Sequence, residues 1–200
     1  MVNGSNFIDG VNISSIGYYL GIFICIYFLS TSNDFIVNLI LIENQIMILS
    51  ILLIFNVLNK TYLGDGGIYF LSMLSAVIII QFISQNSLIS PYFAVSMLWY
   101  PCFENLFSIF RKSINKIKVS KADNYHLHHL IYSSLKNKKF FISNNNLTGL
   151  IILFFNFIIF FLSLNFFNNT KYLLIIILSS IIIYCFTYFI LLKKLKVTSN

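Results

Sequence analysis

The chain places one of its few carboxylates among glycines, at the start of an apolar stretch. Asp65 lies within Gly64-Asp65-Gly66-Gly67, and the whole chain holds only 6 Asp and Glu residues. Glycines permit a positive φ and a close approach of a ligand, and carboxylate oxygens are ligands that Mg²⁺ prefers. Asp65 is therefore a candidate for holding a divalent cation or, through it, a phosphate. The alternative is an Asp-Gly turn in which Asp65 caps the following helix.

The N-terminal segment carries polar side chains at intervals of three. Asn3, Asn6 and Asp9 are followed by Gly10. On a helix, this spacing would put two amides and a carboxylate on one face, where they could bind a base or a sugar and hold a cation. The alternative is a polar helix end followed by an Asp-Gly turn.

All histidines of the chain lie within one short segment. His126, His128 and His129 are the 3 histidines, and the first and last would share a helical face. A histidine cluster can bind zinc, but no cysteine lies near and Asp123 is the only nearby acid. In a lysine-rich segment, hydrogen bonding to phosphate or sugar is the stronger interpretation. A solvated loop is the alternative.

These polar clusters interrupt a chain whose composition suits lipid. The chain is 58% hydrophobic and 10% charged, whereas an average soluble domain is roughly 25% charged. A soluble fold of this length could not bury so much apolar surface, so we expect an all-α, polytopic integral membrane helix bundle. Cys25, Cys102 and Cys185 lie far apart in apolar stretches, which predicts neither a disulfide framework nor a cysteine metal site.

Six apolar segments are long enough, or nearly so, to cross a bilayer. They are residues 13–31, 36–58, 66–84, 88–110, 147–167 and 171–192. Polar residues 43–45 interrupt the second segment, so residues 36–42 could lie at the interface while the rest crosses. We expect residues 1–200 to form a single transmembrane domain whose longest polar loop is residues 111–146.

The basic residues orient the spans. When the six segments alternate across the bilayer, all 13 Lys and Arg residues except Lys171 fall on one side. The positive-inside rule makes that side cytoplasmic, and Arg111, Lys112 and the lysines after them are expected to pair with anionic lipid headgroups. The three polar clusters lie on the same side, which favours one site built from segments distant in sequence.

Glu104 is an acid inside the fourth apolar segment, about two helical turns before Arg111. An acid at that depth is costly unless it is paired or close to the interface. We therefore expect Glu104 to make a structural hydrogen bond rather than to take part in catalysis. Pro91 is expected to start this span and Pro101 to kink it.

Taken together, the three clusters resemble the polyprenyl-phosphate N-acetylhexosamine-1-phosphate transferase superfamily (glycosyltransferase family 4). The segment NGSNFIDGVN is similar to its Asn-x-x-Asn-x-x-Asp-Gly motif, although VNISS departs from the usual continuation after Gly10. YLGDGGIYFL resembles its Gly-Asp-x-Gly motif. HLHHL resembles the His-x-His-His loop of the branch that transfers simple sugar phosphates. The resemblance covers about residues 1–135.

The resemblance implies an enzyme of the bacterial inner membrane, active on the cytoplasmic face, in lipid-linked glycan synthesis. It would transfer a sugar-1-phosphate from a UDP-sugar to a polyprenyl phosphate and release UMP. Asp65 and Asp9 would act in catalysis. Asp65 would hold Mg²⁺ or Mn²⁺, which suppresses repulsion between the anionic substrates, and Asp9 would be a second metal ligand or a contact to the nucleotide. Asn3 and Asn6 would bind the nucleotide. The diphosphate or the sugar would meet the three histidines, and the lipid tail would lie between spans.

Members of this family carry further spans and an aspartate pair ahead of the first motif, whereas this chain opens inside it. We therefore expect the C-terminal portion of such an enzyme, completed by an N-terminal half on another chain or present as a homodimer. An inactive or split fragment is the alternative function. A transporter subunit is less favoured, because the polar residues gather at one face instead of at the midplane. No nucleic-acid partner is expected.

Overall fold

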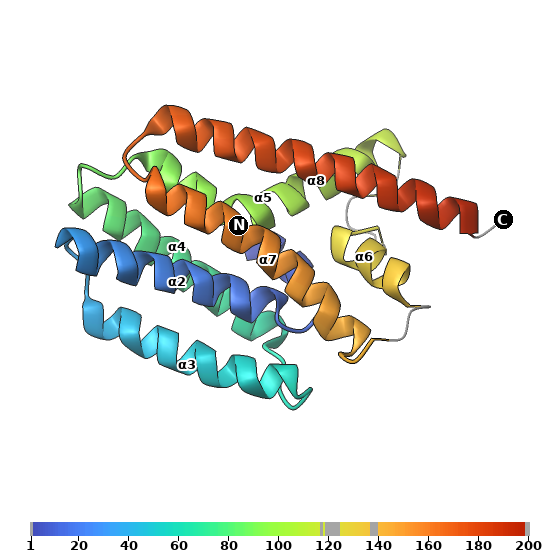
Figure 1. Cartoon of the computed structure of the whole chain (residues 1–200), viewed down its shortest axis with the longest axis horizontal. Helices are drawn as coiled ribbons and strands as arrows, with labels where there is room; N and C mark the ends of the chain where they lie inside the picture. Colours follow the sequence, from blue (N-terminus) through green and yellow to red (C-terminus); the bar gives the residue numbers. More distant parts are fainter. Residues whose placement is uncertain (1, 117, 119–124, 137–139, 199–200) are drawn as a thin grey trace.

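All regular structure in the described part of the chain is helical (Figure 1). The computed structural model describes residues 2–116, 118, 125–136 and 140–198. The helices are α1 (Val2–Ile8), α2 (Ser14–Asn33), α3 (Leu39–Val57), α4 (Gly64–Gln85), α5 (Pro91–Ile114), α6 (Leu127–Leu135), α7 (Asn144–Asn165) and α8 (Thr170–Thr198).

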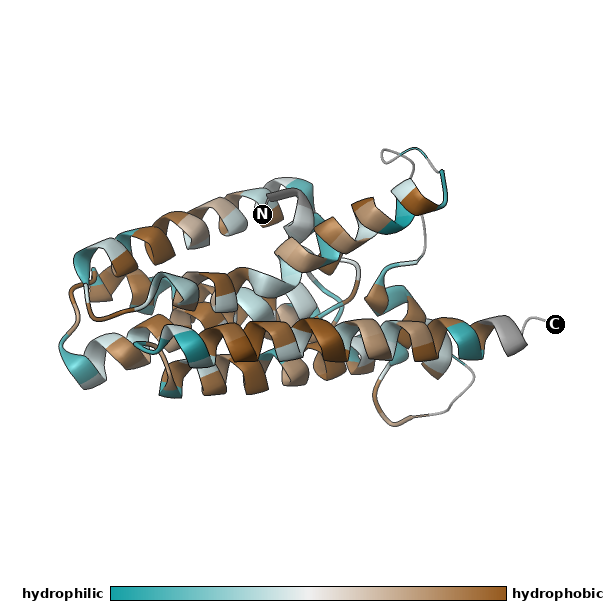
Figure 2. Ribbon diagram, turned by 90° about the horizontal axis from the view of Figure 1, so that it is seen from above, coloured by the Kyte–Doolittle hydropathy of each residue, from teal (hydrophilic) through white to brown (hydrophobic). Residues whose placement is uncertain are grey.

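Five of these helices are long and apolar enough to cross a membrane, namely α2, α3, α4, α7 and α8. Helix α5 has the length but carries Glu104 and Arg111 as well as Pro101, and it is less apolar than the other five. It nevertheless runs alongside them across the bundle, where it contacts α4, α7 and α8. Apolar residues predominate along the long helices (Figure 2). The chain is a multi-pass membrane protein with a bundle of about six helices, which confirms the predicted fold class.

The helix bounds follow local signals in the sequence. Helix α5 begins at Pro91, where the missing N–H is not needed, and the Ser90 hydroxyl accepts a hydrogen bond from Tyr92 N. The predicted start of this span at a proline is confirmed. Helix α3 is continuous from Leu39, so Glu43 lies exposed within its second turn. The helix is thus not interrupted at residues 43–45, and the alternative in which residues 36–42 lie at the interface stays a prediction.

Successive long helices run in opposite directions, which gives the bundle two ends (Figure 1). One end, called here the polar end, gathers the turn after α1, the loop between α3 and α4, and the segment from the end of α5 to the start of α7. The other end holds the connections between α2 and α3, α4 and α5, and α7 and α8. The three polar clusters therefore meet at one end of the bundle, as the alternation of spans predicts.

A network of asparagine side chains fixes the turn between α1 and α2. Asn12 Nδ2 donates to Asn59 Oδ1 at 2.6 Å and to Asn146 Oδ1 at 2.9 Å. Asn56 Oδ1 accepts a hydrogen bond of 2.7 Å from Ile13 N. Ile13 has a φ of 73°, which is strained for a β-branched residue. The side chains from α3, α7 and the loop after α3 thus stabilise a backbone conformation that the turn would not adopt alone.

Helix α7 approaches this turn closely at Gly149. A Cβ atom at this position would lie 1.8 Å from the carbonyl oxygen of Asn12. The obstacle is backbone, so no side-chain rotation would relieve it. The glycine therefore allows α7 to pack against the start of α2, and this packing holds the turn that carries Asp9 and Gly10.

Candidate functional site

Two adjoining cavities lie at the polar end of the bundle. The first, called the histidine cavity, has a volume of about 220 Å³ and is lined by Asn6, Phe7, Gly10, Lys112, His126, His128 and His129. The second, called the asparagine cavity, has a volume of about 130 Å³ and is lined by Asp9, Gly10, Val11, Asn12, Asn56, Tyr62 and Asn145. Gly10 belongs to both walls, so the two cavities meet at the turn after α1.

His128 packs directly against this shared wall. A Cβ atom at Gly10 would lie 2.2 Å from His128 Nε2, so only glycine fits here without displacing the ring. His128 is 3% exposed. Burial, with smaller contributions from His129 and His126, lowers the pKa of His128 to about 3. The ring is therefore neutral near pH 7, and its buried Nδ1 has no hydrogen-bond partner among the described residues. The ring of His128 is thus a neutral wall of the histidine cavity with one nitrogen that bonds to no described residue.

His126 is held from two sides. Its ring stacks on Phe7 of α1, with ring centroids 4.5 Å apart and planes inclined by 22°. Its Nδ1 lies 3.0 Å from Glu104 Oε1. The same oxygen accepts a 3.3 Å bond from Leu127 N, and Oε2 accepts a 2.5 Å bond from the Tyr184 hydroxyl. The structural hydrogen bond predicted for Glu104 is confirmed, and it joins α5 to the start of α6 and to α8.

Two basic residues, Arg111 and Lys112, lie in the last turn of α5. Both were expected to pair with lipid headgroups. Lys112 is only 4% exposed and lines the histidine cavity, so it does not point to a lipid surface. The guanidinium carbon of Arg111 lies 5.6 Å from the ring centroid of Tyr125, in a cation–π contact. An ammonium group beside imidazoles and an amide gives the cavity donors for phosphate or sugar oxygens.

The two predicted metal ligands lie at the same end of the bundle. Asp9 follows α1, lines the asparagine cavity and accepts a hydrogen bond from the Ser15 hydroxyl. Asp65 is exposed in the first turn of α4. Burial raises the pKa of Asp9, the Ser15 bond lowers it in part, and the nearby Asp65 carboxylate raises it further. The two carboxylates therefore interact, and a cation between them would relieve their repulsion.

The surroundings of Asp65 are open. Gly64 has a positive φ of 64°, as predicted for a glycine turn, and a Cβ atom at Gly66 would meet nothing within 4 Å. The cap position of α4 is Leu63, so the alternative in which Asp65 itself caps this helix is wrong. An exposed carboxylate at a helix start leaves room for a bulky anionic ligand that brings its own oxygens to a cation.

Asp9 and Asp65 fit Mg²⁺ through the chemistry of their donors. Mg²⁺ keeps several waters and is commonly held by one or two carboxylates together with phosphate oxygens of a substrate. Among the residues that the structure describes, no group of three or more His, Cys, Asp or Glu side chains converges as a metal site. A cation at this pair would take its remaining ligands from water and substrate.

The predicted face of Asn3, Asn6 and Asp9 is divided in the structure. Helix α1 ends at Ile8, so Asp9 follows the helix instead of lying on it. Asn6 lines the histidine cavity, whereas Asp9 lines the asparagine cavity. The side chain of Asn3 lies outside the described part of the chain. The prediction of one shared face is therefore wrong for Asn6 and Asp9.

The amides beside Asp9 come from residues that the sequence analysis did not select. Asn56 lies near the C-terminal end of α3, and Asn145 lies in the first turn of α7. Tyr62 is exposed in the loop before α4. An asparagine near the end of an apolar span and the run of asparagines at residues 144–146 were available signals. Only the packing of α3 and α7 against the first turn shows that they meet.

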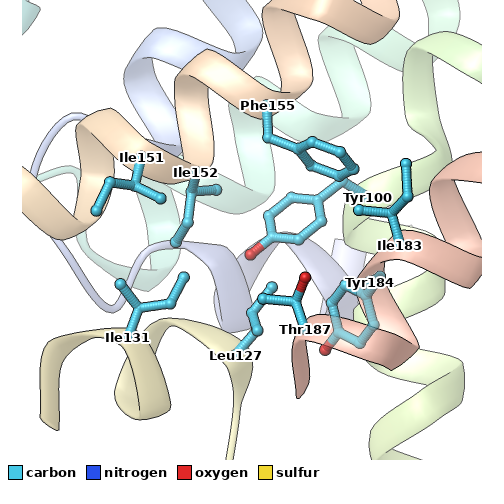
Figure 3. A pocket seen from close by; sticks show the side chains of 9 residues that line it. All are labelled: Tyr100, Leu127, Ile131, Ile151, Ile152, Phe155, Ile183, Tyr184 and Thr187. Atoms are coloured by element: carbon cyan, nitrogen blue, oxygen red, sulfur yellow. The ribbon is translucent and has the colours of Figure 1, made fainter. Parts of the chain in front are cut away.

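A third cavity, which is apolar, lies behind α6 (Figure 3). It has a volume of about 170 Å³ and is lined by Tyr100, Leu127, Ile131, Ile151, Ile152, Phe155, Ile183, Tyr184 and Thr187. Tyr100 extends into it, and its buried hydroxyl has no hydrogen-bond partner among the described residues. Tyr184 lines this cavity and also donates to Glu104. Apolar space therefore lies directly beside the residues that position His126.

No protein-family model, no curated protein and no solved structure matches this chain. The resemblance to the transferase superfamily consequently rests on the three motifs and their order along the chain. What the structure adds is independent of that resemblance, namely the two cavities and the residues that line them.

Proposed function

We propose that this chain binds a UDP-sugar at the polar end of the bundle and belongs to an enzyme that transfers its sugar-1-phosphate to a polyprenyl phosphate. The observation that carries the proposal is that the segments around Asp9, Asp65 and His128 meet there and enclose two cavities with a common wall at Gly10. Among the residues that the structure describes, the lysines and arginines other than Lys171 belong to segments at this end, so we assign it to the cytoplasmic face of a bacterial inner membrane.

The asparagine cavity suits the nucleotide. Uracil presents both donors and acceptors along one edge, and carboxamide side chains supply both. Asn56 already bonds to Ile13 N and to the Thr61 carbonyl, so Asn12 Oδ1 and Asn145 Nδ2 would supply the acceptor and the donor in this cavity. The ring of Tyr62 offers a surface for base stacking. We therefore assign the base to this cavity rather than to Asn6, which lines the other one.

The histidine cavity suits the sugar phosphate. Lys112 supplies a cationic donor, and Asn6 and the histidines supply further polar groups around the same space. A ligand that begins in the asparagine cavity and passes Gly10 would bring its middle portion close to Asp9. A diphosphate has its charge in that middle portion, between the base and the sugar.

The chemistry then follows from charge. The lipid phosphate oxygen forms a bond to the β-phosphorus, and the bond from this phosphorus to the bridging oxygen breaks, so that UMP leaves. Both reactants are anions, and Mg²⁺ held by Asp9 and Asp65 would supply the charge neutralisation that lets them meet. Lys112 reduces the repulsion from the side of the sugar. The polyprenyl chain would lie along the apolar helices, with the cavity behind α6 next to the site.

The test is UDP binding and UMP release by the chain in lipid nanodiscs, with polyprenyl phosphate, several UDP-sugars, and Mg²⁺ or a chelator. We expect Mg²⁺-dependent binding of UDP, and UMP release that Asp65→Asn lowers by about 100-fold or more, as for other groups that stabilise developing charge. Asp34→Asn is the matched control, because Asp34 is the C-cap of α2 at the opposite end. Normal UDP binding and UMP release by Asp65→Asn would overturn the metal assignment. If the wild-type chain does not bind UDP, the proposed function is wrong.

A further inference from the structure

Glu104 is a buried carboxylate to which the proposed function gives no role. It is 1% exposed and accepts hydrogen bonds from His126 Nδ1, Leu127 N and the Tyr184 hydroxyl. Burial of a carboxylate is costly unless its oxygens are hydrogen-bonded. The three bonds explain how the fold tolerates Glu104, but a purely apolar side chain would pack here without that cost.

The bond to Glu104 determines which nitrogen of His126 carries a proton. A carboxylate oxygen accepts, so Nδ1 must donate, and Nδ1 holds a proton whether the ring is neutral or charged. In the neutral ring, the lone pair then belongs to Nε2. In water, neutral histidine favours the opposite tautomer. Since His126 lines the histidine cavity, the tautomer decides whether this side chain is an acceptor or a donor there.

Two further contacts prevent His126 from turning away. The ring stacks on Phe7 at a centroid separation of 4.5 Å, which fixes its plane. The Tyr184 hydroxyl, 2.5 Å from Oε2, fixes the carboxylate. His128 differs, because its Nδ1 has no hydrogen-bond partner among the described residues. Of these two histidines, only His126 has a buried carboxylate that specifies its tautomer.

We propose that Glu104 is a positioning residue, which holds His126 in the Nδ1–H form so that Nε2 accepts a hydrogen bond from a hydroxyl group of the bound sugar. Tyr184 completes the arrangement by orienting the carboxylate. An acceptor at His126 beside a cationic donor at Lys112 is complementary to a hydroxyl group next to a phosphate. The identity of the ligand rests on the proposed function, whereas the tautomer does not.

The tautomer can be measured without turnover. The full chain, labelled with ¹⁵N-histidine in nanodiscs, gives separate ring-nitrogen signals for its 3 histidines, assigned by replacing each in turn. We expect the neutral ring of His126 to show the Nδ1–H form. Glu104→Leu shifts it toward the Nε2–H form, Tyr184→Phe shifts it in part, and Glu104→Gln largely retains it, because the amide oxygen still accepts. Tyr184→Phe keeps the test decisive if Glu104→Leu does not fold.

The matched control is Asn156→Leu. Asn156 is fully buried in α7, and its Oδ1 accepts a 3.1 Å bond from Trp99 Nε1 of α5. This variant also removes a buried polar contact of α5, but the contact does not involve a histidine. A shift of the His126 tautomer in Asn156→Leu equal to that in Glu104→Leu would overturn the proposal. So would the Nε2–H form of His126 in the wild-type chain.

Ligand binding separates this proposal from the function on which it rests. Glu104→Leu is expected to weaken binding of the UDP-sugar by about fivefold to tenfold, the value of one hydrogen bond, and to leave UDP binding unchanged. An unchanged affinity for the UDP-sugar, together with a shifted tautomer, would overturn the assignment of the hydroxyl partner. If UDP does not bind to the wild-type chain, the proposed function is wrong, while the tautomer measurement still decides the role of Glu104.

Discussion

The asparagine cavity and the histidine cavity share a wall at Gly10, yet Asn12 and Asn56 in the first are bonded to the fold differently from His128 in the second. In the asparagine cavity, Asn12 and Asn56 hydrogen-bond to α7, to the loop after α3 and to the strained turn at Ile13. In the histidine cavity, a nitrogen of His128 has no hydrogen-bond partner among the described residues. Asn12 and Asn56 of the first cavity therefore stabilise the fold around it, whereas His128 of the second keeps a ring nitrogen that bonds to no described residue.

The substitution with the largest expected effect is Gly149→Ala, which tests whether the packing of α7 supports the asparagine cavity. The new methyl group would lie 1.8 Å from the Asn12 carbonyl oxygen, so α7 must move away from the first turn. We expect a loss of stability of about 1–3 kcal/mol or more and loss of UDP binding, measured by thermal unfolding in detergent and by titration. Gly66→Ala is the matched control, because its methyl group meets nothing within 4 Å. Equal stability of the two variants would contradict the close packing of α7.

Asn56→Ala tests whether the asparagine cavity is structural. It leaves the buried N–H of Ile13 without its 2.7 Å partner, which costs about 1–3 kcal/mol. His128→Gln removes a ring that makes no Nδ1 hydrogen bond in the described structure, so its effect on stability should be smaller. Its effect on UDP-sugar binding should exceed its effect on UDP binding. The comparison fails if His128→Gln destabilises the chain more than Asn56→Ala does.

Gly10→Ala tests whether a ligand extends from one cavity into the other past their common wall. The added methyl group would lie 2.2 Å from His128 Nε2 and must displace that ring. Because the obstacle is the end of a side chain, we expect a modest loss of stability, below that of Gly149→Ala. We also expect at least a tenfold loss of UMP release, because both cavities change shape. Full activity in Gly10→Ala would show that a ligand does not cross this wall.

The smallest expected effect on stability is that of Asp9→Asn, and it is an increase instead of a loss. Burial, together with Asp65, raises the pKa of Asp9 above its ordinary value, so the folded chain binds this proton more tightly than the unfolded chain does. Ionised Asp9 thus costs stability near pH 7, and that cost disappears as the pH falls through the carboxyl range. Asp9→Asn should therefore raise Tm slightly at pH 7, with no rise at acid pH, while UMP release is lost. A pH-independent change in Tm would contradict this explanation.

Much of the fold could be predicted from the sequence, because lipid imposes strong constraints. Apolar length determines the spans, and the alternation of these spans brings the polar clusters to one end. The helix bounds at Pro91 and Gly64 also follow from local chemistry. Burial is different, because it depends on what packs nearby. Lys112 belongs to a basic run in the sequence, yet it is buried in a cavity wall.

The division between the cavities could not be predicted for a related reason. Asn6 and Asp9 have helical spacing, but α1 ends at Ile8, which is buried in the core. The chain then turns through Ile13 at positive φ, and only side chains from distant segments stabilise that conformation. A pattern within ten residues contains no information about those segments. The candidate residues were therefore close to the site, while their distribution between two cavities required the packed structure.

Gly10 gives the junction of the two cavities an unusual evolutionary property. A molecule that occupies both would pass the bare main chain of Gly10 and the ring of His128, which packs against it. Substitution of an amide in the asparagine cavity or of an imidazole in the histidine cavity would change the contacts of one end of such a molecule. Substitution of Gly10 would add a side chain that obstructs the junction between the two cavities. Preferences for different end groups could thus diversify while the central linkage stayed the same.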